Sequence, residues 1–275
     1  MATTEVVLRI RRFDPSSGGP PRWEDVPVSL APGMTVLDAL RWIKEGPSPT
    51  LTWRSSCRMG VCGSCGMFIN GRPRLACNTQ MADLHSTIVS VAPLPDFPII
   101  RDLVPDLARM FDSHAALAPY LIRGDREEQE RPTREYRQTP EEMERYLQFS
   151  YCIKCGCCLS ACPTYATDPA YSGPMPLAQA QRYNADGRDG GFAARAAVLA
   201  GSRGPWRCHY AGECSRVCPK GVDPARAIQL LRRDLVLGAL GLRRLRRPAP
   251  VVEAPRETRR RPDIPEAPTP SVTRV

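Results

Sequence analysis

Two cysteine runs in the second half of the chain restrict its possible folds more than any other feature. The first run is Cys152-Ile-Lys-Cys155-Gly-Cys157-Cys158-Leu-Ser-Ala-Cys162-Pro163, which contains the spacing C-x2-C-x2-C-x3-C-P. The second run, at residues 208–219, repeats this spacing but has Ala211 where the second cysteine belongs. The spacing is typical of loops that hold cubane iron–sulfur clusters, where three thiolates of a run bind one cluster and the fourth binds the other.

The crossed runs predict two clusters of different type. A [4Fe–4S] cluster takes four thiolates, from Cys152, Cys155, Cys158 and Cys218. The other cluster keeps only Cys162, Cys208 and Cys214, because Ala211 supplies no sulfur, and is most simply [3Fe–4S]. Cys157 falls outside the ligand spacing, and we expect it to be a small buried hydrophobic residue beside the cluster.

Zinc is the alternative occupant of these sites, because it is also bound by thiolates at C-x2-C spacing. Zinc takes four ligands per site, usually from two separated pairs, and the two runs ending in C-x3-C-P do not match that pattern. In a cytosolic chain, many cysteines favour metal binding over disulfides. The colour of the protein distinguishes the two metals, since iron–sulfur protein is brown and zinc protein is colourless.

A third set of cysteines lies in the first half of the chain. Its spacing is C-x4-C-x2-C followed by a fourth cysteine after eleven residues, which is the plant-type [2Fe–2S] pattern. Gly60 and Gly63 fit a loop whose backbone approaches the cluster closely. No histidine stands among the ligands, which excludes a Rieske centre. The predicted [2Fe–2S] ligands are Cys57, Cys62, Cys65 and Cys77.

The chain around these motifs predicts an α+β protein with two domains. Residues 5–12 and 25–30 have strand periodicity, and Thr35 caps a helix that Gly46 and Pro47 end, which is how a β-grasp ferredoxin begins. We therefore expect a β-grasp plant-type [2Fe–2S] ferredoxin domain at residues 1–103. Residues 104–242 have helical periodicity, including a strong helix start at Thr139, and predict an all-α domain like a bacterial dicluster ferredoxin.

Residues 243–275 predict a disordered tail, because they contain nine arginines, four acidic residues and seven prolines. This segment contributes most of the formal net charge of +9. It is either a solvated extension or a contact with anionic lipid headgroups. Nucleic acid is not an expected partner, since no aromatic residue accompanies the arginines. We expect no signal peptide and no membrane span, so the chain is soluble by itself and any membrane partner is another chain.

Together these motifs resemble the iron–sulfur subunit of succinate dehydrogenase and fumarate reductase. The resemblance covers roughly residues 5–240 and is specific at residues 56–66, 74–77, 97–103 and 218–224. It implies a flavoprotein partner with covalent FAD beside the [2Fe–2S] cluster. It also implies a transmembrane anchor, with or without heme, that holds quinone beyond the [3Fe–4S] cluster. The chain would lie on the cytoplasmic face of the cell membrane and carry no substrate-binding catalytic residue.

The resemblance implies four quinone contacts in this chain. His209 matches a histidine near quinone in many succinate dehydrogenases, and Pro163 lies beside the same cluster. Gln229 and Arg232 match polar and basic residues near quinone in fumarate reductases. The frequent tryptophan of the family is replaced by Thr167, which is a departure. A surface position or a contact with heme propionate is the alternative role of His209.

The predicted function is electron transfer from the FAD subunit to membrane quinone in a succinate dehydrogenase. The same subunit in a quinol:fumarate reductase is the alternative, because the sequence does not determine the direction. An iron–sulfur subunit of another flavin dehydrogenase is a second alternative. Such subunits generally keep full cysteine sets in both runs and lack the plant-type domain, so Ala211 and the Cys57–Cys77 set argue against it. A zinc-structured interaction module is the third.

Overall fold

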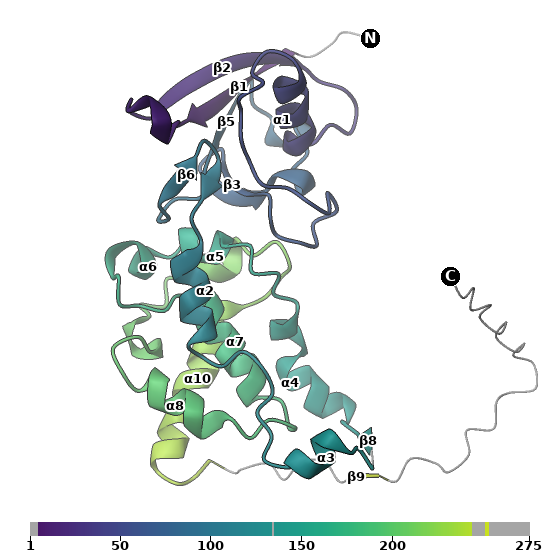
Figure 1. Cartoon of the computed structure of the whole chain (residues 1–275), viewed down its shortest axis with the longest axis vertical. Helices are drawn as coiled ribbons and strands as arrows, with labels where there is room; N and C mark the ends of the chain where they lie inside the picture. The colour runs from purple at the N-terminus through teal and green to yellow at the C-terminus, as the bar shows by residue number, and fades with distance from the viewer. Residues whose placement is uncertain (1–4, 134, 244–250, 253–275) are drawn as a thin grey trace, which may run out of the picture.

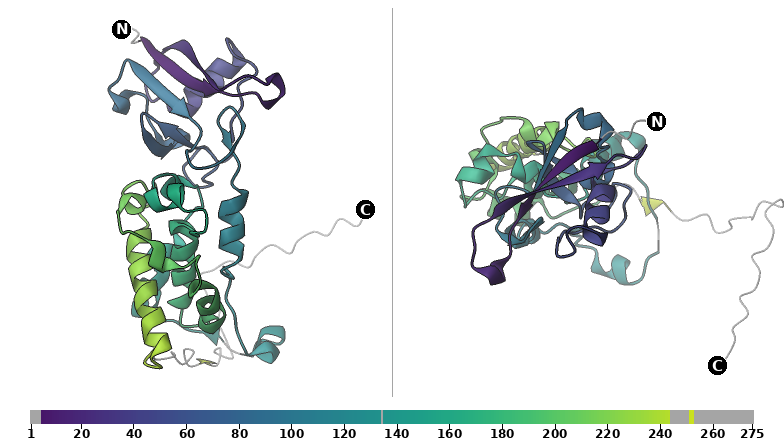
Figure 2. Two further views of the ribbon diagram at one scale, coloured as in Figure 1. Left: turned by 90° about the vertical axis from the view of Figure 1, so that its left-hand side faces the viewer. Right: turned by 90° about the horizontal axis from the view of Figure 1, so that it is seen from above.

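The computed structural model describes residues 5–133, 135–243 and 251–252. A sheet with one covering helix lies at one end of the long axis, and helices make up the other end (Figures 1 and 2). No helix in these described ranges is long and apolar enough to cross a membrane. The fold is thus α+β, with the sheet formed by the first hundred residues.

The sheet has five strands in the order β2-β1-β5-β3-β4. β1 pairs antiparallel with β2 and parallel with β5, while β3 pairs antiparallel with both β4 and β5. Strand β2 begins earlier than the strand predicted at 25–30, because all of its residues pair with β1. The strands are β1 (Glu5–Arg12), β2 (Arg22–Ser29), β3 (Gly66–Ile69), β4 (Arg72–Leu75) and β5 (Ile88–Ala92).

Helix α1 (Val36–Glu45) packs against this sheet (Figure 1). The capping box predicted at its start is confirmed, since Thr35 and Asp38 exchange side-chain and backbone hydrogen bonds. Its buried residues Leu40 and Ile43 join the alternate buried residues Leu8 and Ile10 of β1 in one core. Burial of these aliphatic side chains is the main stabilising term for this end of the molecule.

A short crossing segment connects the sheet to the helices. It contains the paired strands β6 (Ile99–Arg101) and β7 (Val104–Pro105). Asp102, which is buried, accepts a hydrogen bond from Arg12 Nε at 3.0 Å and from the backbone N–H of Thr52 at 2.9 Å. Both partners belong to the sheet end, so this carboxylate fixes the crossing segment to it.

The helical end is centred on α7, which packs against both α4 and α10. Helix α4 begins at Pro140 with the predicted Thr139 cap and a complete capping box with Glu142. The α-helices here are α2 (Ala108–Ala115), α3 (Arg126–Glu130), α4 (Pro140–Ser150), α5 (Cys157–Ser160), α6 (Pro163–Thr167), α7 (Pro174–Asn184), α8 (Phe192–Leu199), α9 (Glu213–Arg216) and α10 (Pro224–Ala239). The short 3-10 helix η4 (Pro205–Arg207) also lies here, while the described part of the sheet end contains η1 (Pro15–Ser17), η2 (Ala76–Asn78) and η3 (Ala82–Leu84).

The prediction of an all-α second domain needs one correction. Strand β8 (Glu135–Tyr136) pairs antiparallel with β9 (Val251–Val252), which the polar composition around residue 135 did not indicate. The prediction of a disordered tail at residues 243–275 is therefore wrong at Val251–Val252, because these residues form a strand. Arg243, the first residue of the predicted tail, donates a hydrogen bond to the Asn184 carbonyl at 3.0 Å, and its guanidinium lies 3.6 Å from the ring centre of Phe192. The prediction of disorder for residues 244–250 and 253–275 lies outside the described residues.

Candidate iron–sulfur centres

All twelve cysteines are free thiols, and the eleven predicted ligands gather in three places. One is the loop before β3. The other two are small cavities in the helical end, each lined by cysteines from both runs. Cys157 lines neither cavity and is fully buried at the start of α5, as expected for a non-ligand.

The first centre is the loop of residues 57–65 together with Cys77. Backbone N–H groups point at its sulfurs, with Cys62 N–H and Val61 N–H donating to Cys57 Sγ at 3.2 and 3.3 Å. Cys77 N–H donates to Cys65 Sγ at 3.5 Å. Amides aimed at sulfur stabilise thiolate charge, so the backbone of this loop already suits an anionic cluster.

The thiols of this loop differ in their environment. Hydrogen bonds from the Ser64 hydroxyl and from backbone amides lower the pKa of Cys62 to about 6. Burial raises the pKa of Cys65 to about 12. The loop between the first two cysteines is exposed, with 73% of Met59 and 54% of Val61 accessible. The first centre is therefore buried on the side of Cys65 and open to a partner on the side of Met59.

The second centre is a cavity of about 20 Å³ lined by Cys152, Cys155, Cys158 and Cys218. The apolar residues Met175, Ala178 and Val222 complete its wall. Burial raises the pKa of Cys152 to about 11 and also raises that of Cys158. Buried thiols of this kind stay protonated unless positively charged metal replaces the proton, so the donor set fits a cluster with four thiolate ligands.

The third centre is a cavity of similar size lined by Cys162, Cys208 and Cys214. Ala211 forms part of its wall, so the position without a thiol faces the same cavity as the three thiols. Burial raises the pKa of Cys214 to about 11. Three thiols and one methyl group fit a cluster that lacks one protein ligand.

Tyr171 also lines the third centre, although no motif in the sequence indicated it. Its side chain is 1% exposed, and its hydroxyl has no hydrogen-bond partner of standard geometry among the described residues. Burial raises the pKa of Tyr171, and the Cys208 sulfur raises it further. The hydroxyl is thus a neutral donor in the wall of the cavity that the three thiols share.

The backbones of the two runs follow the same course. Left-handed residues stand at the same offsets from the first cysteine, Lys154 (φ 54°) and Gly156 (φ 85°) in one run and Tyr210 (φ 58°) and Gly212 (φ 77°) in the other. Each run then enters a one-turn helix, α5 or α9. Bulky residues rarely adopt positive φ, so its repetition shows that the shape of this loop is required. Ala211 occupies the position that Cys155 holds in the first run.

The four residues implied as quinone contacts lie around the third centre. Pro163 and His209 line its cavity. Arg232 donates hydrogen bonds to the carbonyls of Cys208 at 2.6 Å and Pro205 at 2.9 Å, and to Gln229 Oε1 at 3.4 Å. Arg232 therefore holds the loop that carries Cys208.

Sequence reasoning did not single out two exposed aromatic residues beside Cys208. Trp206 is 51% exposed and Tyr210 is 59% exposed, and the Arg232 guanidinium lies 5.8 Å from the Trp206 ring centre. Their closeness to a predicted ligand was the signal that could have found them. Thr167, where the family often has tryptophan, is exposed at the end of α6.

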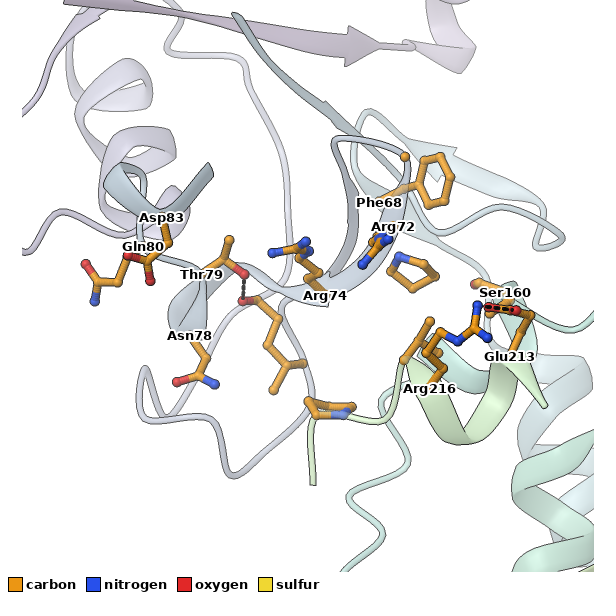
Figure 3. Close-up of a pocket in the computed structure, with 16 residues that line it drawn as sticks. Phe68, Arg72, Arg74, Asn78, Thr79, Gln80, Asp83, Ser160, Glu213 and Arg216 are labelled. Carbon is orange, nitrogen blue, oxygen red and sulfur yellow. Dashed lines mark hydrogen bonds and ion pairs between the residues drawn. The ribbon is translucent and has the colours of Figure 1, made fainter. Parts of the chain in front are cut away.

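The boundary between the sheet and the helices is open on one side. A groove of about 550 Å³ is lined by residues of β3 and β4 on one side and by residues at α5 and α9 on the other (Figure 3), although β4 and α5 also contact each other. Arg72 and Arg74 face it from the sheet, and Glu213 and Arg216, an ion pair at 2.9 Å, face it from α9. No cysteine lines this groove, so it is not a fourth centre.

Comparison with known families defines the class of protein. Residues 7–112 match the family described as 2Fe-2S iron-sulfur cluster binding domain, and residues 148–222 match the 4Fe-4S dicluster domain. The chain thus consists of a [2Fe–2S] domain that contains the sheet, followed by a largely helical dicluster domain.

Three relatives and one solved structure identify the family. The fumarate reductase iron-sulfur subunit of Mycobacterium tuberculosis is 46% identical over 86% of this chain and 94% of its own length. The fumarate reductase iron-sulfur subunit of Haemophilus influenzae is 42% identical over 83% of this chain and 92% of its own length. The succinate dehydrogenase iron-sulfur subunit of Paracoccus denitrificans is 39% identical over 86% of this chain and 90% of its own length. The Mycobacterium smegmatis Sdh1 complex in the apo form contains a chain similar to this one, with a TM-score of 0.73 and 28% identity over 86% of this chain and 97% of that chain. This chain belongs to the family of fumarate reductase and succinate dehydrogenase iron–sulfur subunits.

Proposed function

We propose that this chain is the electron-transfer subunit of a membrane-bound succinate:quinone or quinol:fumarate oxidoreductase. The observation that carries the proposal is the placement of three thiol sets along one molecule, with adjacent sets in contact. The loop of the first set meets the loop of the second at Cys155, and the second and third sets share the two crossed runs.

The proposed ligands follow the three sets. Cys57, Cys62, Cys65 and Cys77 hold [2Fe–2S] in a β-grasp, plant-type ferredoxin domain. Cys152, Cys155, Cys158 and Cys218 hold [4Fe–4S], and Cys162, Cys208 and Cys214 hold [3Fe–4S], in a domain like a bacterial ferredoxin. When bound, the clusters supply the one-electron carriers. The protein supplies burial, ligand geometry and N–H···S hydrogen bonds, which together set the reduction potentials.

Two short helices connect the second and third centres. Helix α5 runs between Cys158, which lines the second cavity, and Cys162, which lines the third. Helix α9 begins beside Cys214 of the third cavity and leads to Cys218 of the second. Helices α5 and α9 also contact each other. Each helix therefore keeps two ligands of different centres within one turn or so, which holds the centres at a constant spacing.

The partners are assigned from the exposed surface of each centre. The open loop with Met59 and Val61 is the proposed contact for an FAD-containing flavoprotein. The exposed surface at His209, Trp206 and Tyr210 is the proposed contact for quinone and for one or more transmembrane anchor subunits, with or without heme. Pro163, Gln229 and Arg232 complete the quinone vicinity. The complex is placed at the cytoplasmic face of the cell membrane, with no nucleic-acid partner and with substrate chemistry on the flavoprotein.

Fumarate reduction is the second candidate direction. Relatives named as fumarate reductase subunits reach 46% and 42% identity, compared with 39% for a succinate dehydrogenase subunit. Succinate oxidation, the direction predicted first, uses the same chain of clusters in reverse. The two differ in the relative potentials of quinone and substrate rather than in the ligands of this chain.

Purification of the native complex tests the proposal. We expect about nine iron atoms per copy of this chain, brown colour and no stoichiometric zinc. Succinate:quinone and quinol:fumarate activities should then be assayed separately. Cys214→Ala should lose the third cluster and quinone-linked activity, whereas Cys157→Ala, a matched change at a cysteine outside both cavities, should keep all iron. A colourless protein that contains zinc would contradict the proposal. Nine iron atoms per chain without succinate:quinone or quinol:fumarate activity would rule out this class of complex.

A further inference from the structure

Two glycines of the [2Fe–2S] loop touch the backbone of the first cysteine run. Gly63 and Gly66 are both buried. A Cβ on Gly63 would lie 2.8 Å from the Ile153 carbonyl oxygen and 3.0 Å from the Cys155 Cβ. A Cβ on Gly66 would lie 2.8 Å from the Cys155 carbonyl oxygen. These distances are shorter than Cβ atoms tolerate, so the loops of the first and second centres approach as closely as two backbones can.

The contact, and not only local conformation, requires glycine here. Gly63 has φ +74°, which by itself favours glycine. Gly66 is the first residue of β3 and has no such conformation, so any L residue could adopt its backbone. Its nearest obstacle is backbone, which moves only if the loops move. A substitution at Gly66 therefore tests the contact between the two loops without also straining the backbone of Gly66 itself.

Each glycine is adjacent to a proposed ligand on its own loop. Cys65 lies between Gly63 and Gly66 in sequence, and Cys155 is the residue that both glycines meet. The Cys155 side chain packs against the core of the sheet end and also against the core of the helical end. Cys155 is thus the ligand at which the two ends of the molecule join.

The rest of the boundary is held by side-chain contacts and by the approach of α5 to β4. On one side a groove of about 550 Å³ lies between the sheet and the helices (Figure 3). Elsewhere Leu94 packs against Gly156, and the Ser160 hydroxyl donates to the Pro95 carbonyl at 3.0 Å. Leu94 and Phe97 are buried in the core of the helical end, and the Phe97 ring centre lies 5.8 Å from that of Tyr165. These are side-chain contacts and one hydrogen bond, whereas the glycine contacts are made with the backbone of the first cysteine run.

We propose that Gly63 and Gly66 are positioning residues that set the separation between the first and second centres. The proposal rests on the proposed function of the cysteine sets. The rate of electron tunnelling falls steeply with distance, so a side chain that wedges the two loops apart slows this one transfer step. The wedge presses on the carbonyl oxygen, Cα and Cβ of Cys155 and not on its sulfur, so we expect all the proposed ligands to stay bound while the two loops move apart.

The test uses the complete complex with Gly66→Ala in this chain. We expect unchanged iron content, a weaker magnetic interaction between the reduced [2Fe–2S] and [4Fe–4S] clusters in electron paramagnetic resonance (EPR) spectra, and slower reduction of the second cluster after rapid mixing. Flavin reduction by succinate should keep its rate. Full iron with unchanged magnetic interaction and unchanged transfer rate would overturn the proposal. Absence of iron from the unmodified complex would instead overturn the proposed function.

A matched pair of variants covers the case in which Gly66→Ala does not assemble. Gly63→Asn and Gly71→Asn both place asparagine, which tolerates positive φ, at left-handed positions with φ +74° and +75°. A Cβ at Gly71 meets nothing within 4 Å, so only the Gly63 variant wedges the loops. Weakened magnetic interaction in Gly63→Asn alone supports the proposal. Loss of iron in both the Gly63 and Gly66 variants, with full iron in Gly71→Asn, would show that the glycines serve cluster assembly and would overturn it.

Discussion

Ala211→Cys is the change that tests the assignment of the third centre most directly. Ala211 stands at the same offset in its run as Cys155, between residues with the same left-handed conformations. It also lines the cavity that Cys162, Cys208 and Cys214 share. A sulfur added to its Cβ therefore enters the position of a fourth ligand, and we expect [3Fe–4S] to become [4Fe–4S].

The size of the effect follows from the site. Ala211 is exposed, so the added sulfur displaces no packed neighbour, and the free energy of unfolding should change by no more than about 0.5 kcal/mol. Iron content should rise from about nine to about ten atoms per chain. A fourth thiolate adds negative charge beside the cluster, so its reduction potential should fall. Electron delivery to quinone should slow, while succinate oxidation with an artificial acceptor at the flavin should persist.

EPR spectroscopy is the assay, because oxidised [3Fe–4S] is paramagnetic and oxidised [4Fe–4S] of this type is silent. The signal should be present in the unmodified protein and lost in Ala211→Cys. Glu213→Cys is the matched control, since position 213 corresponds to the non-ligand Cys157 of the first run and lines the same cavity. The control should keep the signal. If the oxidised unmodified protein shows no [3Fe–4S] signal, the assignment of a [3Fe–4S] cluster to Cys162, Cys208 and Cys214 is wrong.

Three further predictions concern single side chains. Arg195→Ala should lower the free energy of unfolding by about 3–5 kcal/mol, because it leaves the buried Asp189 carboxylate without its cation. Arg9→Ala, at an exposed ion pair, should leave the free energy of unfolding nearly unchanged in the same denaturation experiment. Burial lowers the pKa of His114 from 6.5 to about 4, so between these pH values the unfolded chain binds a proton that the folded chain does not. The free energy of unfolding should therefore fall as the pH decreases from 6.5 to about 4, by roughly 2 kcal/mol after a discount for solvent screening. Thermal melts of His114→Leu at several pH values should no longer show this pH dependence. Tyr171→Phe removes a buried donor beside Cys208 and should lower the potential of the third cluster in a redox titration, with unchanged iron content.

The features that the sequence predicted are those set by neighbouring residues. Helix caps at Thr35 and Thr139 act within three residues, and strand alternation in β1 acts over two, so short patterns were sufficient to find them. The grouping of cysteines from residues 152–162 with those from 208–218 also followed from spacing, because each run forms a similar loop.

The features that the sequence did not predict depend on backbone atoms from distant segments. Arg232 holds the Cys208 loop through carbonyl groups, and any residue type provides a carbonyl, so no side-chain pattern marks the partner. The β8–β9 ladder joins segments more than a hundred residues apart through two residues each. The requirement at Gly66 comes from the Cys155 carbonyl across the domain boundary, whereas the neighbours of Gly66 in sequence show only a strand.

The three centres differ in what holds them together, and this difference has a consequence for tuning. The second and third centres share helices α5 and α9, so we expect a change that moves one centre relative to the other to disturb a proposed ligand set. The first centre belongs to a separate hydrophobic core, which meets the helical core around Cys155. Its distance from the second centre is therefore set by the packing between these two cores, and a single substitution at their contact can change that distance. On the proposed assignment, substitutions at Gly63 and Gly66 should therefore alter the first transfer step while every proposed cluster ligand remains in the chain.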